Sequence, residues 1–203
     1  RDKEGYMVLD VDQTSYLDAL VERFGLSDRE KYSDRTTPLP AASSIHQLKQ
    51  AMGDCSKPEF KAWMEEYSYP MIIGSLIHAM VHTRPDIGYA VSALSRAMAN
   101  PEPWHYKAAQ YLILYLRATR EKGIHYDQGQ MLRQMAKVTA TTESKYNQHV
   151  DASVDASFAD DEENYRSTSG FVIWFGGSPV IWECKRQPLV TMSTMESEYV
   201  AAS

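Results

Sequence analysis

The chain has 203 residues, of which 43% are hydrophobic and 24% charged, and this predicts one or two globular domains. A net charge of −6 argues against a general nucleic-acid-binding protein. No apolar run approaches the roughly 18 residues of a membrane span, and the first residues form no apolar signal segment, so we expect an intracellular protein with no membrane partner. The two cysteines, Cys55 and Cys184, have no metal-binding spacing and indicate free thiols.

Residues 1–126 predict a mainly helical region. A short alternating segment over 6–11 predicts a strand. Apolar residues spaced by one, three and four positions over 15–24 predict a helix, which Gly25 ends. The polar, proline-containing stretch that follows predicts a loop with a short helix near 45–52.

Two proline-containing breaks divide the helical pattern that follows. A helix is expected from about residue 69, and the sequence TRPD at 83–86 predicts that it stops and that Thr83 caps a new helix. The sequence NPEP at 100–103 repeats this pattern, with Asn100 as the cap, and predicts a third helix that ends at Gly123.

The polar stretch over 127–147 predicts a linker, and from residue 148 onwards the pattern becomes strand-like. The Gly176-Gly177 pair between two apolar runs predicts a β-hairpin. Ser193 or Thr194 can cap a final helix that runs to residue 202. The predicted strands span 149–158, 169–175, 180–185 and, as a short extended piece, 189–192. The chain therefore predicts an α+β fold with a second domain over 148–203.

The excess negative charge lies in the second domain. Residues 149–203 hold nine acidic and three basic side chains, whereas the rest of the chain is balanced. Such a concentration is either a solvated face or a cation site. Carboxylates on a strand and on an adjacent helix can hold hard cations such as Mg²⁺, and two such ions can bind the attacking and leaving oxygens of a phosphodiester.

Three stretches together resemble the copia-type LTR retrotransposon Pol polyprotein. They are the sequence TRPDIGYAVSALSR at 83–96 with the helix after it, VDASFAD at 154–160 running into RSTSGF at 166–171, and KRQP at 185–188 leading to STMESEY at 193–199. The resemblance implies that 1–126 is part of the reverse transcriptase thumb and connection region. It also implies that 148–203 is a truncated RNase H domain, an incomplete unit of a β-hairpin, a strand and a helix.

The resemblance carries over two candidate catalytic residues, which are also metal ligands. The family's first-strand Asp corresponds to Asp155, and its helix Glu corresponds to Glu198, with Glu196 as the alternative. Glu196 and Glu198 point roughly 200° apart on a helix, so both cannot face one ion. The implied cofactor is Mg²⁺ in a two-metal site. The family's polymerase Asp pair is expected before residue 1, and the later RNase H ligands after residue 203.

Other residue patterns have simpler interpretations. The acidic run over 160–163 is typical of a solvated turn. His78 and His82 have the i, i+4 spacing of zinc sites, but no third ligand is evident, so packing or surface roles are favoured. Four basic residues that could follow a phosphate backbone, or only form a charged helix face, are Lys107, Arg117, Arg120 and Lys122.

Three functional hypotheses remain open. In the first, the parent polyprotein copies RNA into DNA and degrades the RNA of the hybrid, and this chain alone is inactive. In the second, the chain is a non-catalytic remnant that binds hybrid or template–primer duplex. In the third, it is a scaffold with no nucleic-acid role. The remainder of the Pol polyprotein is the expected protein partner.

Overall fold

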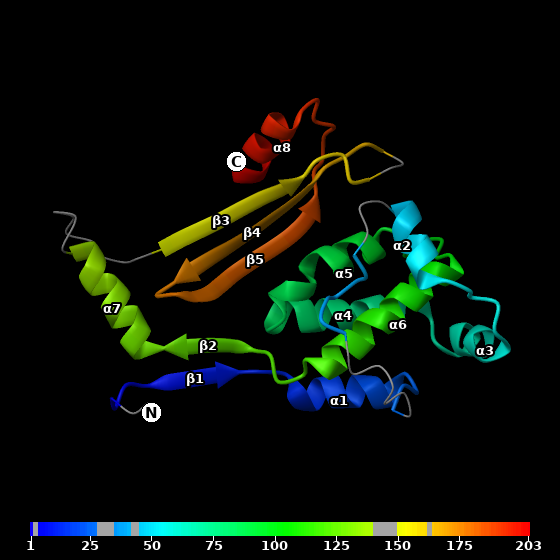
Figure 1. Cartoon of the computed structure of the whole chain (residues 1–203), viewed down its shortest axis with the longest axis horizontal. Helices are drawn as coiled ribbons and strands as arrows, with labels where there is room; N and C mark the ends of the chain where they lie inside the picture. The colour runs from blue at the N-terminus through cyan, green and yellow to red at the C-terminus, as the bar shows by residue number, and fades with distance from the viewer. Residues whose placement is uncertain (2–3, 28–34, 42–44, 140–149, 162–163) are drawn as a thin grey trace.

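The computed structural model describes residues 1, 4–27, 35–41, 45–139, 150–161 and 164–203 (Figure 1). The fold is α+β, as predicted, with helices and two small antiparallel sheets. Figure 1 shows the helices α1 to α6 gathered on one side, and the sheet β3-β4-β5 with α8 on the other. The helices are α1 (Thr14–Arg23), α2 (Ile45–Met52), α3 (Pro58–Glu66), α4 (Tyr69–His82), α5 (Gly88–Ser95), α6 (Pro103–Ala118), α7 (Gln128–Thr139) and α8 (Thr194–Ala202), with a 3₁₀ turn, η2 (Pro85–Ile87).

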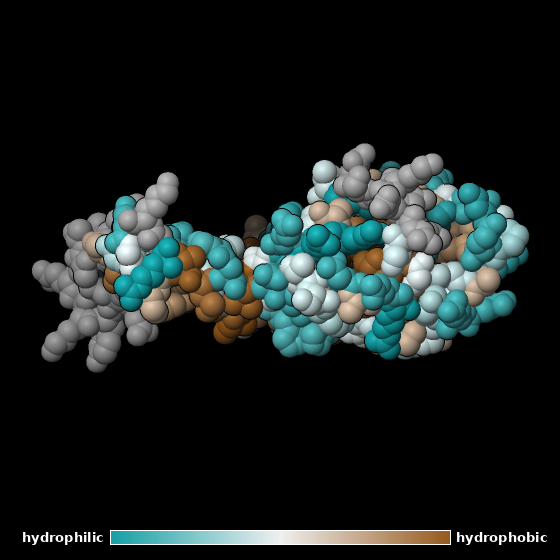
Figure 2. Space-filling model, turned by 90° about the horizontal axis from the view of Figure 1, so that it is seen from below, coloured by the Kyte–Doolittle hydropathy of each residue, from teal (hydrophilic) through white to brown (hydrophobic). Residues whose placement is uncertain are grey.

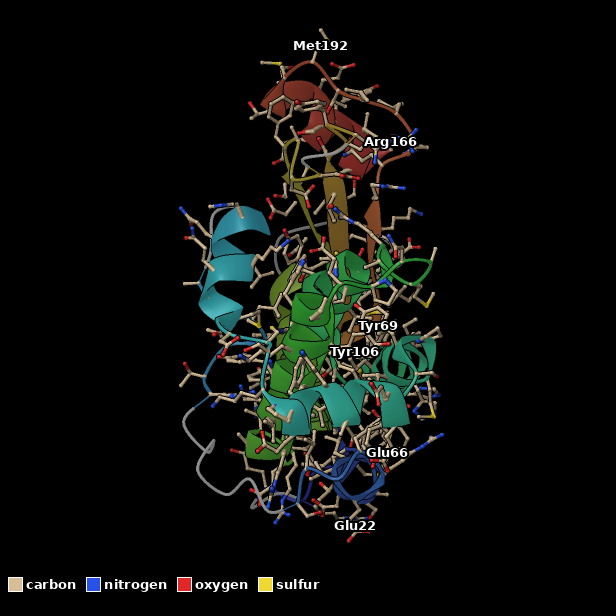
Figure 3. All side chains as sticks on the ribbon, turned by 90° about the vertical axis from the view of Figure 1, so that its right-hand side faces the viewer. Glu22, Glu66, Tyr69, Tyr106, Arg166 and Met192 are labelled. Atoms are coloured by element: carbon tan, nitrogen blue, oxygen red, sulfur yellow. The ribbon has the colours of Figure 1, made fainter. Side chains whose placement is uncertain are left out.

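The main hydrophobic core lies among the helices. Helices α4 and α6 contribute half of its buried residues in the described part of the chain, because both carry apolar side chains on more than one face; Ile72, Leu76 and Ile113 are fully buried. Burying such a side chain stabilises the fold by about 1.5–3 kcal/mol. Figure 3 shows Tyr69 and Tyr106 together in this region, and their ring centroids lie 5.0 Å apart.

Polar groups connect the helices where the core ends. The indole of Trp63 donates a hydrogen bond of 2.7 Å to the carbonyl of Phe24, and the hydroxyl of Tyr69 donates one of 2.8 Å to the carbonyl of Leu94. Gly25, at φ +62°, ends the first helical segment as predicted, since this left-handed conformation favours glycine.

The sequence TRPD forms the expected break between α4 and α5, but Thr83 does not cap the second helix. Thr83 follows the last residue of α4, and its hydroxyl donates a 2.7 Å hydrogen bond to Gln13. Arg84, which is 1% exposed, reaches back to the end of α6 and donates to the carbonyl and the hydroxyl of Thr119. The cap of α6 is Glu102 and not Asn100, and Pro103 occupies the first turn.

The smaller sheet consists of β1 (Val8–Val11) and β2 (Ile124–Asp127). β1 was expected, whereas β2 was not, because its pairing joins residues that are far apart in the chain. Figure 2, which views the molecule from below, shows a hydrophobic surface beside the helical body, where the β1-β2 ribbon lies. Met7, Leu9 and Val11 supply exposed apolar side chains on alternate positions of this ribbon.

The larger sheet has the order β3-β4-β5, with β3 (Val150–Ser157), β4 (Thr168–Phe175) and β5 (Ser178–Arg186). This confirms the first three predicted strands and the predicted hairpin. Gly176 and Gly177, which form the turn of the hairpin, both have positive φ. Residues 189–192 form no strand, so that expectation was wrong. Polar contacts fix this segment instead: the buried hydroxyl of Thr191 bonds to that of Ser167.

The stretch assigned to a linker is partly helical. Gln128–Thr139 forms α7, and Asp127 accepts hydrogen bonds from the backbone of Gly129 and Gln130 at its start. The remaining residues of the predicted linker, 140–147, lie outside the described residues. The domain boundary itself stays a prediction.

Candidate functional site

Asp155 lies near the end of β3, opposite Gly170 of β4, which in turn lies opposite Cys184 of β5. Because side chains alternate along strands, these three positions share one face of the sheet. That face packs on the helical region: a Cβ added to Gly88 of α5 would lie 3.3 Å from the Cβ of Cys184. The indole of Trp182, on the same face, donates a 2.8 Å hydrogen bond to the carbonyl of Met80.

A cavity of about 860 Å³ lies between this face of the sheet and α4, η2 and α5, beside these contacts. Asp155 lines it, together with Asp86 and Tyr89 from the helical side. The rest of the lining that this face of the sheet supplies is largely apolar and includes Val172 and Trp182. Burial raises the pKa of the Cys184 thiol, which also lines the cavity, so this thiol stays protonated at neutral pH.

Glu198 lies on α8, and its neighbour Glu196 has a structural role. Ser193 caps the helix by accepting a 3.2 Å hydrogen bond from the backbone of Glu196. The Glu196 carboxylate in turn accepts a 2.7 Å bond from the backbone N–H of Met192. This reciprocal pattern closes the first turn of a helix. Glu198 is exposed one half-turn further on, so the geometry favours Glu198 over Glu196 as an available ligand.

The structure does not assemble Asp155 and Glu198 into a metal site. Asp155 projects from the face toward the helical region, whereas α8 is hydrogen-bonded to the opposite face through Gln187 and Ser169. β3 is an edge strand, and Figure 1 shows α8 beside it. The two carboxylates can therefore approach each other only around the open edge of β3. Across the described parts of the chain, no group of three or more His, Cys, Asp or Glu side chains could hold a metal ion.

The prediction of a solvated turn over 160–163 was wrong for its first two residues. Asp160 is 9% exposed and accepts hydrogen bonds of 2.8 and 2.7 Å from the hydroxyl of Thr168. Arg96, which follows the last residue of α5, donates to the same hydroxyl at 2.5 Å and lies 3.4 Å from Asp160. Asp161, 6% exposed, pairs with Arg186 at 2.6 Å. Glu162 and Glu163 lie outside the described residues.

Asp160 connects the two parts of the molecule, whereas the pair of Asp161 with Arg186 lies within the sheet region. Asp160 links the end of β3 to the end of α5, and the hydroxyl of Tyr89 donates to the same carboxylate at 3.4 Å. Burial and the adjacent Asp160 charge raise the pKa of Tyr89. Sequence reasoning missed this role because the basic partner, Arg96, lies 64 residues away in the chain.

The four basic residues proposed for nucleic-acid contacts each interact with the protein itself. Lys107 donates to the carbonyl of Asp54, Arg117 to those of Leu26 and Ser27, and Arg120 to the carboxylate of Asp18. The ammonium group of Lys122 lies 5.8 Å from the ring centroid of Tyr115. Most of these contacts join α6 to earlier segments. Phosphate binding by these residues stays a prediction, and the geometry offers a structural use for each of them.

His78 and His82 lie side by side near the end of α4, with ring centroids 4.2 Å apart. Nδ1 of His82 lies 2.8 Å from the carbonyl of His78, and Nδ1 of His78 lies 3.4 Å from the amide of Gln13. Neither belongs to a three-ligand group in the described residues. The structure thus supplies surface and packing contacts for both rings.

The motifs around the sheet also contain a buried polar set to which the sequence analysis gave no role. The members are Ser167, Thr168, Gln187, Thr191 and Ser197, none more than 3% exposed. The available signal was the abundance of Ser and Thr in the sequences RSTSG at 166–170 and TMSTMES at 191–197, which are polar and yet lie close to strong strands. No helix of the described residues is long and apolar enough to cross a membrane.

Comparison with known proteins places the chain in a family. It is 31% identical over 192 residues to the retrovirus-related Pol polyprotein from transposon TNT 1-94 of Nicotiana tabacum, covering 94% of this chain but 13% of that protein. It is 34% identical over 131 residues to the corresponding polyprotein from transposon RE1 of Arabidopsis thaliana, covering 64% of this chain and 8% of the relative. The secreted RxLR effector protein 161 of Plasmopara viticola is 32% identical over 140 residues, which cover 87% of its length.

The chain thus spans only a small part of the Pol polyproteins that it matches. No family model matches it, and no solved structure does. The chain belongs to the retrovirus-related Pol polyproteins of transposons.

Proposed function

We propose that this chain is the segment of a retrotransposon Pol polyprotein in which the reverse transcriptase thumb and connection region passes into an RNase H domain. Its function in the polyprotein is to supply Asp155 and Glu198 as ligands for Mg²⁺ during hydrolysis of the RNA strand of an RNA–DNA hybrid. The observation that supports this best is the placement of Asp155 on an edge strand with α8 beside it. Family membership supports it independently.

The candidate ligands fit magnesium in type but not in number. Carboxylate oxygens are the donors that Mg²⁺ prefers, and a two-metal site positions the attacking water and the leaving oxygen when it is filled. Two carboxylates approaching around the edge of β3 are too few for such a site. We therefore propose that further ligands come from other parts of the polyprotein and that this chain alone does not cleave the hybrid.

A cleavage assay tests this proposal. The 203-residue chain and a longer segment of the same polyprotein are incubated with labelled RNA–DNA hybrid and Mg²⁺. We expect no cleavage by the chain alone, and cleavage by the longer segment that Asp155→Asn and Glu198→Gln each abolish. Glu196→Gln is the matched control, since Gln can also accept the bond from Met192 and should retain activity.

Two results would contradict the proposal. Robust cleavage by the 203-residue chain, abolished by Asp155→Asn, would show that its ligand set is already sufficient. Full activity of the longer segment after Asp155→Asn would remove this residue from the metal site.

A non-catalytic role in binding nucleic acid is the second candidate. It is favoured by the lack of a three-ligand group among the described residues. Binding of hybrid duplex that weakens steeply with salt would support it, because phosphate contacts release counterions. Weak binding with a flat salt dependence would instead favour a scaffold role.

A further inference from the structure

We infer that Gln187 is a positioning residue that fixes α8, and with it Glu198, relative to the strand that lies beside Asp155. The inference rests on the proposed function for the role of Glu198 as a metal ligand. The positioning of α8 by Gln187 rests only on contacts within the structure. Gln187 follows the last residue of β5 and is 2% exposed.

The side chain of Gln187 bridges two elements. Its amide nitrogen donates a 2.9 Å hydrogen bond to the hydroxyl of Ser169 on β4 and another of 2.9 Å to the backbone carbonyl of Ser197 on α8. Ser169 precedes Gly170, the register partner of Asp155, and Ser197 precedes Glu198. One amide group thus connects the strand that pairs with β3 to the residue before Glu198.

The backbone around Gln187 is fixed by the same segment of β4. Its N–H donates a 2.8 Å hydrogen bond to the carbonyl of Ser167. The hydroxyl of Ser167 lies 2.9 Å from that of Thr191, which forms a second buried connection to the segment before α8. Both hydroxyl groups belong to residues that are at most 3% exposed, so these bonds are protected from water.

Helix α8 depends on this network because apolar packing does little to hold it. Ser197 is its only buried residue, and Met195 and Tyr199 are about four-fifths exposed, at 81% and 78%. Figure 3 shows Met192, just before the helix, at the outer end of this part of the molecule. A helix of nine residues is marginal by itself, so its position must come from specific contacts.

The orientation of the Gln187 amide is set by its acceptors. Both contacts of its nitrogen are oxygens that can accept a hydrogen bond, and the carbonyl of Ser197 can only accept. The Gln187 Oε1 is buried with no hydrogen-bond partner among the described residues. Replacing the amide by a thioether of similar length would therefore remove two donated bonds while keeping most of the packing volume.

The test compares Gln187→Met with the wild-type chain by amide hydrogen exchange. We expect amides of α8 to exchange roughly 10- to 100-fold faster in Gln187→Met, which corresponds to the loss of two ordinary hydrogen bonds. Exchange in α4 and α6 should stay unchanged. Gln128→Met is the matched control: it removes an amide that accepts a bond from the backbone of Met7, far from α8, and should leave α8 exchange unaltered. Unchanged exchange of α8 in Gln187→Met would overturn the positioning role.

A spectroscopic measurement then connects the position of α8 to the metal ligands. Paramagnetic Mn²⁺ should broaden the NMR signals of both β3 and α8 in the wild-type form of the longer polyprotein segment used in the cleavage assay, in which the further ligands are expected. In Gln187→Met, broadening should persist on β3 and disappear from α8. Broadening of α8 that survives in the variant would contradict the inference, because Glu198 would then reach the ion without Gln187. No broadening of β3 in the wild type would instead contradict the proposed metal role of Asp155, while the exchange result still decides the role of Gln187.

Discussion

Arg84 and Asp86, two residues apart in the chain, form a bidentate ion pair. Nε of Arg84 lies 2.9 Å from one carboxylate oxygen of Asp86, and Nη2 lies 2.7 Å from the other. The hydroxyl of Tyr115 donates a third bond, of 2.7 Å, to the carboxylate. The guanidinium is 1% exposed and also binds Thr119, so this pair joins the α4–α5 break to the end of α6.

Removing the carboxylate of this pair should strongly destabilise the protein. Asp86→Asn leaves a buried guanidinium without its counter-charge, and because the Asp86 carboxylate is itself 34% exposed, we expect a loss of about 1–3 kcal/mol in the free energy of unfolding. Urea denaturation measures this value. The control is Asp18→Asn, which removes an exposed pair with Arg120 and should cost about 0.2–1 kcal/mol. Equal effects of the two substitutions would show that burial does not strengthen the first pair.

The same pair predicts an acid limit to stability. Burial by itself raises the pKa of Asp86, but the hydrogen bonds from Arg84 and Tyr115 and the charge of Arg84 outweigh it and hold the pKa below its ordinary value. A carboxylate with a lowered pKa in the folded state stabilises the protein above its unfolded pKa of 3.8, and this contribution is lost as the pH falls through the folded value. Below about pH 4, stability should therefore fall more steeply in the wild type than in Asp86→Asn. Parallel curves for the two proteins would exclude this assignment.

Two histidines should titrate on opposite sides of the ordinary value. Burial lowers the pKa of His105, whereas the hydrogen bond that His125 donates to Asp10 raises the pKa of His125. His125 therefore adds stability below its unfolded pKa of 6.5, and this stability is lost as the pH rises through its folded-state pKa. The contribution of His105 is present above its unfolded pKa of 6.5 and is lost as the pH falls through its folded-state pKa. NMR titration of the ring protons measures both. Asp10→Asn should return His125 toward 6.5 and leave His105 unchanged; a shift of both rings would point to a general structural change.

Asp161 and Asp155 should differ in how much each carboxylate contributes to the stability of the fold. Asp161 is 6% exposed and paired with Arg186, which is 35% exposed, so Asp161→Asn should cost about 1–3 kcal/mol. Asp155 is exposed on β3, and Asp155→Asn should change stability by less than about 0.5 kcal/mol. Thermal or urea unfolding of both variants measures these changes in the free energy of unfolding. A large loss in Asp155→Asn would assign Asp155 a structural role.

Local patterns in the sequence determined most of the secondary structure. The helical spacing over 15–24, the break at TRPD, the glycine hairpin and the Ser193 cap all predicted elements that the structure contains. These features depend on side-chain periodicity and on backbone preferences of Gly, Pro and Ser within a few residues. The candidate ligands Asp155 and Glu198 also came from local motifs, and the capping role of Glu196 favours Glu198.

The tertiary structure decided the features that join distant segments. β2 exists because it pairs with β1, and Asp160 is buried because Arg96 lies against it. The orientation of Asp155 toward the helical region and the support of α8 by Gln187 likewise depend on how the sheet packs. The spacing of apolar residues and the backbone preferences of turn residues act between residues that are close in the chain. Ion pairs and strand pairing can join residues that are far apart in the chain, so they depend on which surfaces meet on folding. The sequence alone therefore determined the family and the candidate carboxylates, and only the packing of the two parts determined how those carboxylates are held.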